Sequence, residues 1–269
     1  MFTSFWLEKP KMGPRKILLV FFLICTTILI STLLFTILLV LTILFFCICV
    51  RKYGYNILIE EFSINGQKQK IIDLINPWTH KHIRMISNDF GTLSAIDVAN
   101  PKNNLYMSGI EKIINNDKPN IKFLHIGGGA CSTPILLNHY NPTSSHVVLE
   151  IDAKMIAAAN NFFLPFSFNK KIIQIRTDAN KYKFKKNEKY NYIIQDIFTK
   201  KTDNSDFFLT KKWISKIIKQ LDKNGALIIN TSSKTQDTAI NLALELKNIK
   251  EKIQIINIKR SYLVVIKNE

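Results

Sequence analysis

The sequence has few of the residues that build metal sites and disulfide frameworks. It contains four cysteines, and three of them (Cys25, Cys47 and Cys49) lie in an apolar N-terminal stretch, which leaves Cys131 alone in the remainder. The five histidines show no HExxH or comparable spacing. We therefore expect no disulfide framework and no metal. Such cysteine usage is typical of a reducing, cytoplasmic environment for the soluble part.

Acidic residues are also scarce, with 20 Asp and Glu against 37 Lys and Arg, for a formal net charge of +17. A nucleic acid or an anionic membrane surface would fit this balance. The alternative is a compositional bias, because Lys, Asn and Ile are all heavily used. The lysines are scattered, without a dense basic run and interleaved aromatics, so we expect no specific nucleic-acid partner.

Charge, glycine and proline are all absent from residues 17–50. About twenty apolar residues already cross a bilayer as a helix, and the hydroxyls and thiols in this run can bond back to their own helix. A signal peptide is the alternative, but the run is too long and no small-residue cleavage site follows. We predict a basic tail over residues 1–16 and a retained transmembrane segment over 17–50, with membrane lipid as its partner.

The orientation of this segment stays open. The flank before it is more basic than Arg51 and Lys52, which places the N-terminus in the cytoplasm. A single span would then export the following domain, whereas a tight hairpin of two short spans would return it. The chemistry of the domain, described next, favours the cytoplasm.

Residues 51–104 predict a small β-rich domain. Strands are expected at 57–64 and 70–75, flanking the hairpin signal Asn65-Gly66, and another at 92–98.

Residues 105–269 predict a Rossmann-like nucleotide-binding domain. After a helical pattern at 105–115, strands and helices alternate, which indicates a mostly parallel sheet with helices on both faces. The expected strands are 121–126, 146–151, 172–176, 190–195 and 226–230. One expected helix follows the glycine turn and ends at Tyr140, and two others span 153–163 and 210–222. Segments 252–258 and 261–267 are joined by two residues, which only a hairpin allows. This ending is typical of the class I methyltransferase-like Rossmann fold, so the predicted fold class is α/β.

Ligands of such folds bind at the carboxyl ends of the strands, and four of these ends carry suggestive residues. Gly127, Gly128 and Gly129 allow a sharp turn whose amides can face a carboxylate or a sugar edge. Glu150 lies 23 positions after Gly127, where a carboxylate can accept both ribose hydroxyls.

The next two strands end in Asp178-Ala179, suited to the adenine amino group, and in Asp196, which is expected to point into the same crevice. A single acid at a strand end is usually a helix cap, but the order and spacing of all four sites favour a nucleotide. An NAD site is the rival hypothesis, but Ser132 stands where its third glycine belongs.

These residues resemble spermidine synthase and its spermidine synthase-like relatives over residues 92–267. The resemblance is carried by 123–131 (FLHIGGGAC), 147–152 (VVLEID), 177–179 (TDA) and 190–198 (YNYIIQDIF). It implies a domain that binds S-adenosylmethionine, its decarboxylated form or methylthioadenosine. The glycine turn would hold the nucleoside side, Glu150 the ribose and Asp178 the adenine. The family also implies a homodimer, and Tyr106 as the counterpart of its active-site tyrosine.

Two departures from the family bear on activity. Aminopropyltransferases continue the glycine turn with Asp-Gly, whose acid helps to bind the diamine, and here Ala130 and Cys131 stand there. Their Asp-Ser-Ser-Asp-Pro segment, whose second acid helps to deprotonate the amine, is reduced to Asp196-Ile-Phe-Thr199, closer to the Asp-Ala-Phe of the spermidine synthase-like branch.

Two functional hypotheses follow. The first is a membrane-anchored transferase that moves an aminopropyl or methyl group to a small acceptor such as a polyamine, with Asp196 as the base. The second is a degenerate nucleotide-binding or scaffolding protein of the same fold.

Overall fold

The computed structural model describes residues 14–64, 66–89, 91–103, 107, 109–114, 118–168, 171–185, 187–197, 207–231, 236–247, 252–258 and 261–268. The chain divides into two compact units, Met1–Gly54 and Tyr55–Glu269.

The first unit contains one continuous helix, α1 (Pro14–Tyr53). Its large apolar side chains are exposed from Leu18 to Ile48, and its threonine and serine hydroxyls donate to carbonyls three or four residues earlier. By length and composition it is able to span a bilayer, although a signal sequence has the same features. A rise of about 1.5 Å per residue makes it about 60 Å long. Because the helix is unbroken, the two-span hairpin has no counterpart in the structure.

The second unit begins with a four-stranded antiparallel sheet in the order β1-β2-β3-β4. Its strands are β1 (Tyr55–Ile64), β2 (Gln67–Asn76), β3 (Lys81–Asn88) and β4 (Gly91–Asp97). The sequence did not predict β3, because its His82 and Arg84 interrupt the apolar pattern. Both side chains bond to the buried Asp73 on β2, which allows these polar groups inside the sheet.

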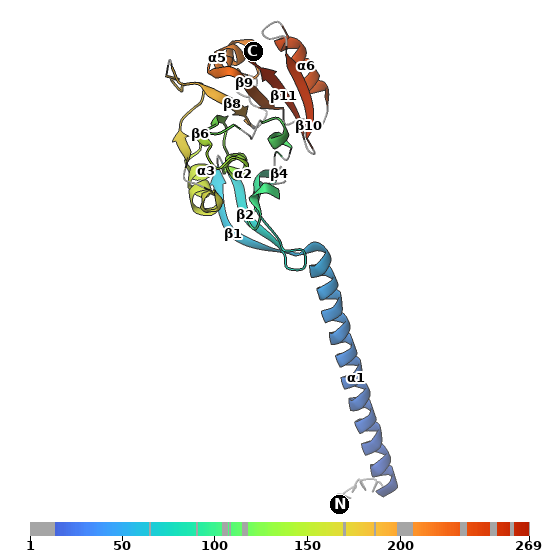
Figure 1. The fold of residues 1–269 in the computed structure, drawn as a ribbon. Coiled ribbons are helices and arrows are strands. Elements are labelled where there is room, and N and C mark those ends of the chain that lie inside the picture. Colours follow the sequence, from blue (N-terminus) through green and yellow to red (C-terminus); the bar gives the residue numbers. More distant parts are fainter. Residues whose placement is uncertain are drawn as a thin grey trace, which may run out of the picture. The chain divides into compact units, whose positions relative to one another are not determined.

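The larger sheet has seven strands in the order β10-β11-β9-β8-β5-β6-β7 (Figure 1). Strands β5 to β9 run parallel, while β11 is antiparallel to both of its neighbours. The predicted fold class, with its terminal antiparallel hairpin, is therefore confirmed. The strands are β5 (Lys122–Ile126), β6 (Ser145–Glu150), β7 (Ile172–Arg176), β8 (Tyr190–Gln195), β9 (Leu221–Asn230), β10 (Ile253–Ile258) and β11 (Ser261–Lys267).

Helices cover both faces of this sheet. One core packs α5 (Lys211–Ile218) and α6 (Gln236–Leu246) against it, and the other packs α2 (Ser132–Tyr140) and the 3-10 turn η2 (Ile110–Lys112). Helix α3 (Ala153–Ala158) continues as a π-helical turn, η3 (Ala159–Phe163), and a 3-10 turn, η4 (Leu164–Phe166). Another 3-10 turn, η1, spans Pro101–Asn103. Helix α6 was not predicted. Where a helix was expected over 105–115, the described residues form only η2.

The small sheet packs on α2 and α3. Ile71, Ile86 and Ile96 from three of its strands share a buried cluster with Ile135 of α2 and Met155 of α3. This contact places β4 beside the glycine turn that precedes α2.

Candidate functional site

The carboxyl ends of four parallel strands meet at one rim of the seven-stranded sheet. The Gly127 amide donates to the Leu149 carbonyl at 3.0 Å, and the Asp196 amide donates to the Ile126 carbonyl at 2.9 Å. The Thr177 amide donates in turn to the Glu150 carbonyl at 2.9 Å. The segments that hold the glycine turn, Glu150, Asp178 and Asp196 are thus consecutive neighbours along the rim.

Close packing explains the first two glycines of the turn. Gly127 has φ +78°, and a Cβ atom there would lie 2.5 Å from the Asp196 carbonyl oxygen. A Cβ at Gly128 would overlap with Cγ1 of Val148. Any side chain would therefore push the turn away from β6 and β8, so glycine is required for the close approach of the strands.

The Glu150 carboxylate is turned toward this glycine loop. Its Oε2 accepts from the Gly129 amide at 3.0 Å, and its Oε1 accepts from the Asp152 amide at 3.0 Å. Burial raises the pKa of Glu150, and these backbone hydrogen bonds offset part of that increase. Each carboxylate oxygen has two lone pairs, so these bonds fix the group and leave it capacity to accept ligand hydroxyls.

The amides of the turn are engaged within the protein. Besides the Gly129 amide, the Ala130 amide donates to Oγ of Ser94 on β4 at 3.1 Å, and the Cys131 amide donates to the Gly128 carbonyl at 2.9 Å. These three groups are therefore not presented to a ligand carboxylate, as the sequence analysis supposed for the turn. Ser94 is a contributor that the sequence did not reveal, because it comes from a distant strand.

Asp178 and Ala179 lie at the next strand end in less ligand-directed roles. Oδ1 of Asp178 accepts from the Asn180 amide at 2.9 Å, which caps a turn, whereas the alternative weighed in the sequence analysis was a helix cap. The Ala179 side chain packs in the core with α5. Any contact of Ala179 with a ligand would have to come from its backbone.

Asp196 is held by a residue that the sequence analysis did not select. Nδ2 of Asn230, at the end of β9, donates to Oδ1 of Asp196 at 2.8 Å and lies 3.4 Å from Sδ of Met107. A polar residue directly after the apolar run 226–229, at the rim end of β9, was the available signal. Tyr106 and Thr199 lie outside the described residues.

The family model for the spermine/spermidine synthase domain matches residues 104–266, more than half of the chain. The chain belongs to this family. The match begins just before η2 and ends in β11, so it covers the whole seven-stranded sheet. Among curated proteins, no sequence matches this chain significantly.

Solved spermidine synthases share the fold. A probable spermidine synthase from Corynebacterium glutamicum aligns with a TM-score of 0.63 at 16% identity, over 78% of this chain and 80% of that one. A spermidine synthase in complex with the transition-state analogue AdoDATO aligns with a TM-score of 0.58 at 15% identity, over 79% of this chain and 74% of that one. Spermidine synthase from Thermotoga maritima aligns with a TM-score of 0.53 at 15% identity, over 79% of this chain and 73% of that one. At these identities the likeness shows the fold alone.

Relative to the spermidine synthase sequence pattern, the turn lacks the acid, because Ala130 and Cys131 stand where that pattern has Asp-Gly. Cys131 has φ +64°, a left-handed conformation that suits the glycine of the family pattern and costs a cysteine on the order of 1 kcal/mol. Its thiol is fully buried, and this burial raises its pKa, so it is not poised as a nucleophile. The Ala130 side chain is also fully buried and offers no charge to a cationic substrate.

No cluster of three or more His, Cys, Asp or Glu that could hold a metal ion occurs within the part of the chain that the structure describes.

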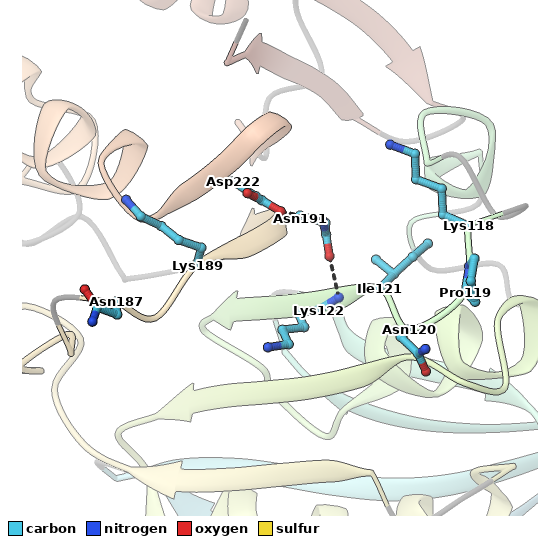
Figure 2. Close-up of a pocket in the computed structure, with 9 residues that line it drawn as sticks. All are labelled: Lys118, Pro119, Asn120, Ile121, Lys122, Asn187, Lys189, Asn191 and Asp222. Carbon is cyan, nitrogen blue, oxygen red and sulfur yellow. Dashed lines mark hydrogen bonds between the residues drawn. The ribbon is translucent and has the colours of Figure 1, made fainter.

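A cavity of about 310 Å³ opens at the opposite rim, at the amino ends of β5 and β8 (Figure 2). The Lys122 amide donates to Oδ1 of Asn191 at 2.8 Å beside it. The residues that line this cavity are Lys118, Pro119, Asn120, Ile121, Lys122, Asn187, Lys189, Asn191 and Asp222. None of the predicted binding residues is among them, so this cavity is not part of the candidate site.

Proposed function

We propose that this chain binds S-adenosylmethionine or its decarboxylated form at the glycine-turn rim and transfers an aminopropyl or methyl group to a small acceptor. The observation that carries the proposal is the Glu150 carboxylate, fixed by the Gly129 and Asp152 amides at the end of β6. In that place it is able to accept both ribose hydroxyls, as charged acceptors do strongly. Membership in the spermine/spermidine synthase family supports the same ligand class.

The chemistry asked of the protein is modest. An acceptor amine attacks the carbon bound to the sulfonium sulfur, the carbon–sulfur bond breaks, and its electrons neutralise the sulfur. The amine proton passes to a base, for which Asp196 is the candidate. Because the donor is intrinsically reactive, holding the amine in line and removing its proton is most of the task. The Asn230 contact orients the Asp196 carboxylate for that role.

A second candidate function is a degenerate nucleotide-binding protein. The observation that favours it is the fully buried Ala130, which stands where the family has an acid. Holding and desolvating a cationic diamine takes several carboxylates. A polyamine acceptor is therefore the weakest part of the first proposal, and a less charged acceptor fits the turn better.

We also propose that α1 is a retained single-span anchor and that the following unit works in the cytoplasm, where its donor is made. This orientation places the N-terminus on the far side of the membrane, so in this proposal the donor chemistry overrides the charge bias of the flanks. Helix length and composition support the anchor.

The experiment is turnover by the full chain in detergent micelles, with each donor and a panel of amines that includes putrescine. Release of methylthioadenosine reports aminopropyl transfer, and release of S-adenosylhomocysteine reports methyl transfer. Asp196→Asn should abolish release, whereas Asp152→Asn, a carboxylate that caps α3, should not. Donor binding without release from any acceptor would replace the first function by the second. Absence of binding would refute both.

A further inference from the structure

The first half of β1 is unusually exposed for an apolar strand. Tyr55, Ile57 and Leu58 are 43%, 42% and 57% exposed, and Ile59 is exposed as well. Successive strand residues point to opposite faces of a sheet, so neither face of this segment is covered. β1 is also the edge strand of its sheet. Such an exposed apolar edge calls for a covering partner.

A fixed turn adds an indole ring to this end of the sheet. Trp78 is 50% exposed, and its amide and that of Thr79 donate to Oδ1 of Asn76 at 3.1 and 3.2 Å. Tyr55 pairs with Ile75, so the turn after β2 lies next to the start of β1. The indole is therefore presented by a hydrogen-bonded turn rather than by a loose loop.

At this end of the sheet the basic side chains are exposed and the acidic ones are buried. Lys81 and His80 are exposed beside Trp78. The acids nearby, Asp73 and Asp97, are buried and accept hydrogen bonds from within the protein. Glu60 and Glu61 begin only where the apolar run of β1 stops. Exposed aromatic and basic residues without acids are the composition of a membrane–water interface.

The chain connection brings this surface to the end of α1. Only Gly54 separates Tyr53, the last residue of the helix, from Tyr55. Two Cα–Cα steps span at most about 7.6 Å. The apolar side chains of α1 remain exposed up to Ile48, close to the end of the helix. If α1 spans a bilayer with this apolar run inside it, chain connectivity keeps the start of β1 within a few residues of the bilayer surface.

We propose that Tyr55, Ile57, Leu58 and the Trp78 turn enter the headgroup region of the bilayer that α1 spans, with Lys81 facing anionic lipid. The inference rests on the membrane anchoring proposed above. It adds a second contact that holds the catalytic unit against the membrane surface. A second copy of the chain pairing along β1 is the competing occupant. The single residue between α1 and β1 keeps this edge near the membrane, whereas no feature of the described residues brings a second copy there.

The test uses the full chain reconstituted in vesicles of phosphatidylcholine and phosphatidylserine, with or without bromine on the acyl chains. All variants carry Trp6→Phe, which leaves Trp78 and Trp213 of the three tryptophans. Fluorescence of this parent minus that of its Trp78→Phe variant isolates Trp78, and the fully buried Trp213 serves as an unquenched reference. The expected result is that brominated lipid quenches the Trp78 component several-fold more than aqueous iodide does. Lys81→Glu should weaken this quenching, while Lys122→Glu at the far rim should not.

Extraction with alkaline carbonate distinguishes a failure of the proposed membrane anchor from a failure of the proposed headgroup contact. Release of the chain would overturn the anchor and this inference together, without touching the nucleotide proposal. A retained chain whose Trp78 is quenched by iodide alone would overturn only this inference. Shielding of Trp78 from both quenchers, dependent on the protein-to-lipid ratio, would assign the edge to a second copy and also overturn it.

Discussion

Nδ2 of Asn230 donates a hydrogen bond to Oδ1 of Asp196 across 2.8 Å, joining the ends of β9 and β8. Asn230 is nearly buried, and its Nδ2 also lies against the Met107 sulfur. The contact fixes the Asp196 carboxylate at the rim where the glycine turn begins.

Replacing Asn230 by leucine should therefore impair proton removal more than donor binding. We expect kcat to fall about tenfold, which corresponds to about 1.4 kcal/mol, a typical value for a hydrogen bond to a charged group. The KM for the donor should change little. Steady-state kinetics at saturating acceptor provide the measurement.

Asn191→Leu is the matched control, because Asn191 bonds to Asp222 and to the Lys122 amide at the opposite rim. Equal losses in the two variants would mean that Asn230 acts only through stability.

A second prediction concerns the join between the two sheets of the second unit. Nε and Nη2 of Arg84 donate to the two oxygens of Asp73 at 2.7 Å each, and Nη1 donates to the Phe162 carbonyl at 3.1 Å. Burial alone would raise the pKa of Asp73, but the hydrogen bonds and charges of Arg84 and His82 lower it overall. Arg84→Met should destabilise the protein by about 3 kcal/mol, because the buried Asp73 carboxylate loses its doubly bonded arginine and keeps the contact with the His82 ring. Urea unfolding followed by circular dichroism measures the loss.

Arg84→Met combined with Asp73→Leu should recover much of that stability, since neither charge then remains buried. Arg84 also lies over the Phe166 ring, 5.3 Å from its centroid. A double variant no more stable than Arg84→Met would show that the arginine acts through this ring and the Phe162 carbonyl instead. Because folding lowers the pKa of Asp73, the ionised carboxylate contributes to folding stability above about pH 3.8. This contribution is lost as the pH falls below that value.

A third prediction concerns two buried histidines in the centre of the larger sheet. Nε2 of His125 and Nδ1 of His146 share a hydrogen bond of 3.0 Å, and Nε2 of His146 lies 2.8 Å from Oγ of Ser144. Burial lowers the pKa of His125 to about 3 and that of His146 well below its usual value. Both rings are therefore neutral in the folded protein.

In the unfolded chain the two imidazole rings are protonated near pH 6.5, whereas in the folded protein burial keeps them neutral to lower pH. Folding stability should accordingly decrease as pH falls from about 6.5 toward 3, by up to about 1.4 kcal/mol per pH unit for each ring. Urea titrations at a series of pH values test this. His125→Asn should flatten the dependence, while substitution of the exposed His80 by Asn should not. An unchanged slope in His125→Asn would refute the assignment.

Strand ends were the most predictable features of the fold. β7 and β8 begin with the strong β-formers Ile172 and Tyr190 and lie where the sequence predicted them. β3 escaped prediction, because its polar residues are compensated by Asp73 on another strand. The helix expected over 105–115 has apolar residues at helical spacing, yet Ile110 and Ile114 reach the core from a segment in which only a 3-10 turn is described. Local pattern could not reveal these long-range compensations.

The candidate site divides in the same way. The residue types and spacing of Gly127, Glu150 and Asp196 were visible in the sequence, because they follow directly from strand order. Ser94 had no such signal, and the polar end of β9 marked Asn230 without showing which residue it contacts. Their partners lie 36 and 34 positions away and are matched only by packing.

Isothermal titration of methylthioadenosine into the full chain and into Glu150→Gln tests the central claim most directly. The wild type should bind, and Glu150→Gln should bind about 10–100-fold more weakly, the effect expected from losing charged acceptors for two hydroxyls. Because burial raises the pKa of Glu150, wild-type affinity should also fall as the solution is acidified. Asp152→Asn should bind as the wild type does. Equal affinity of wild type and Glu150→Gln, or no binding by either, would contradict the account.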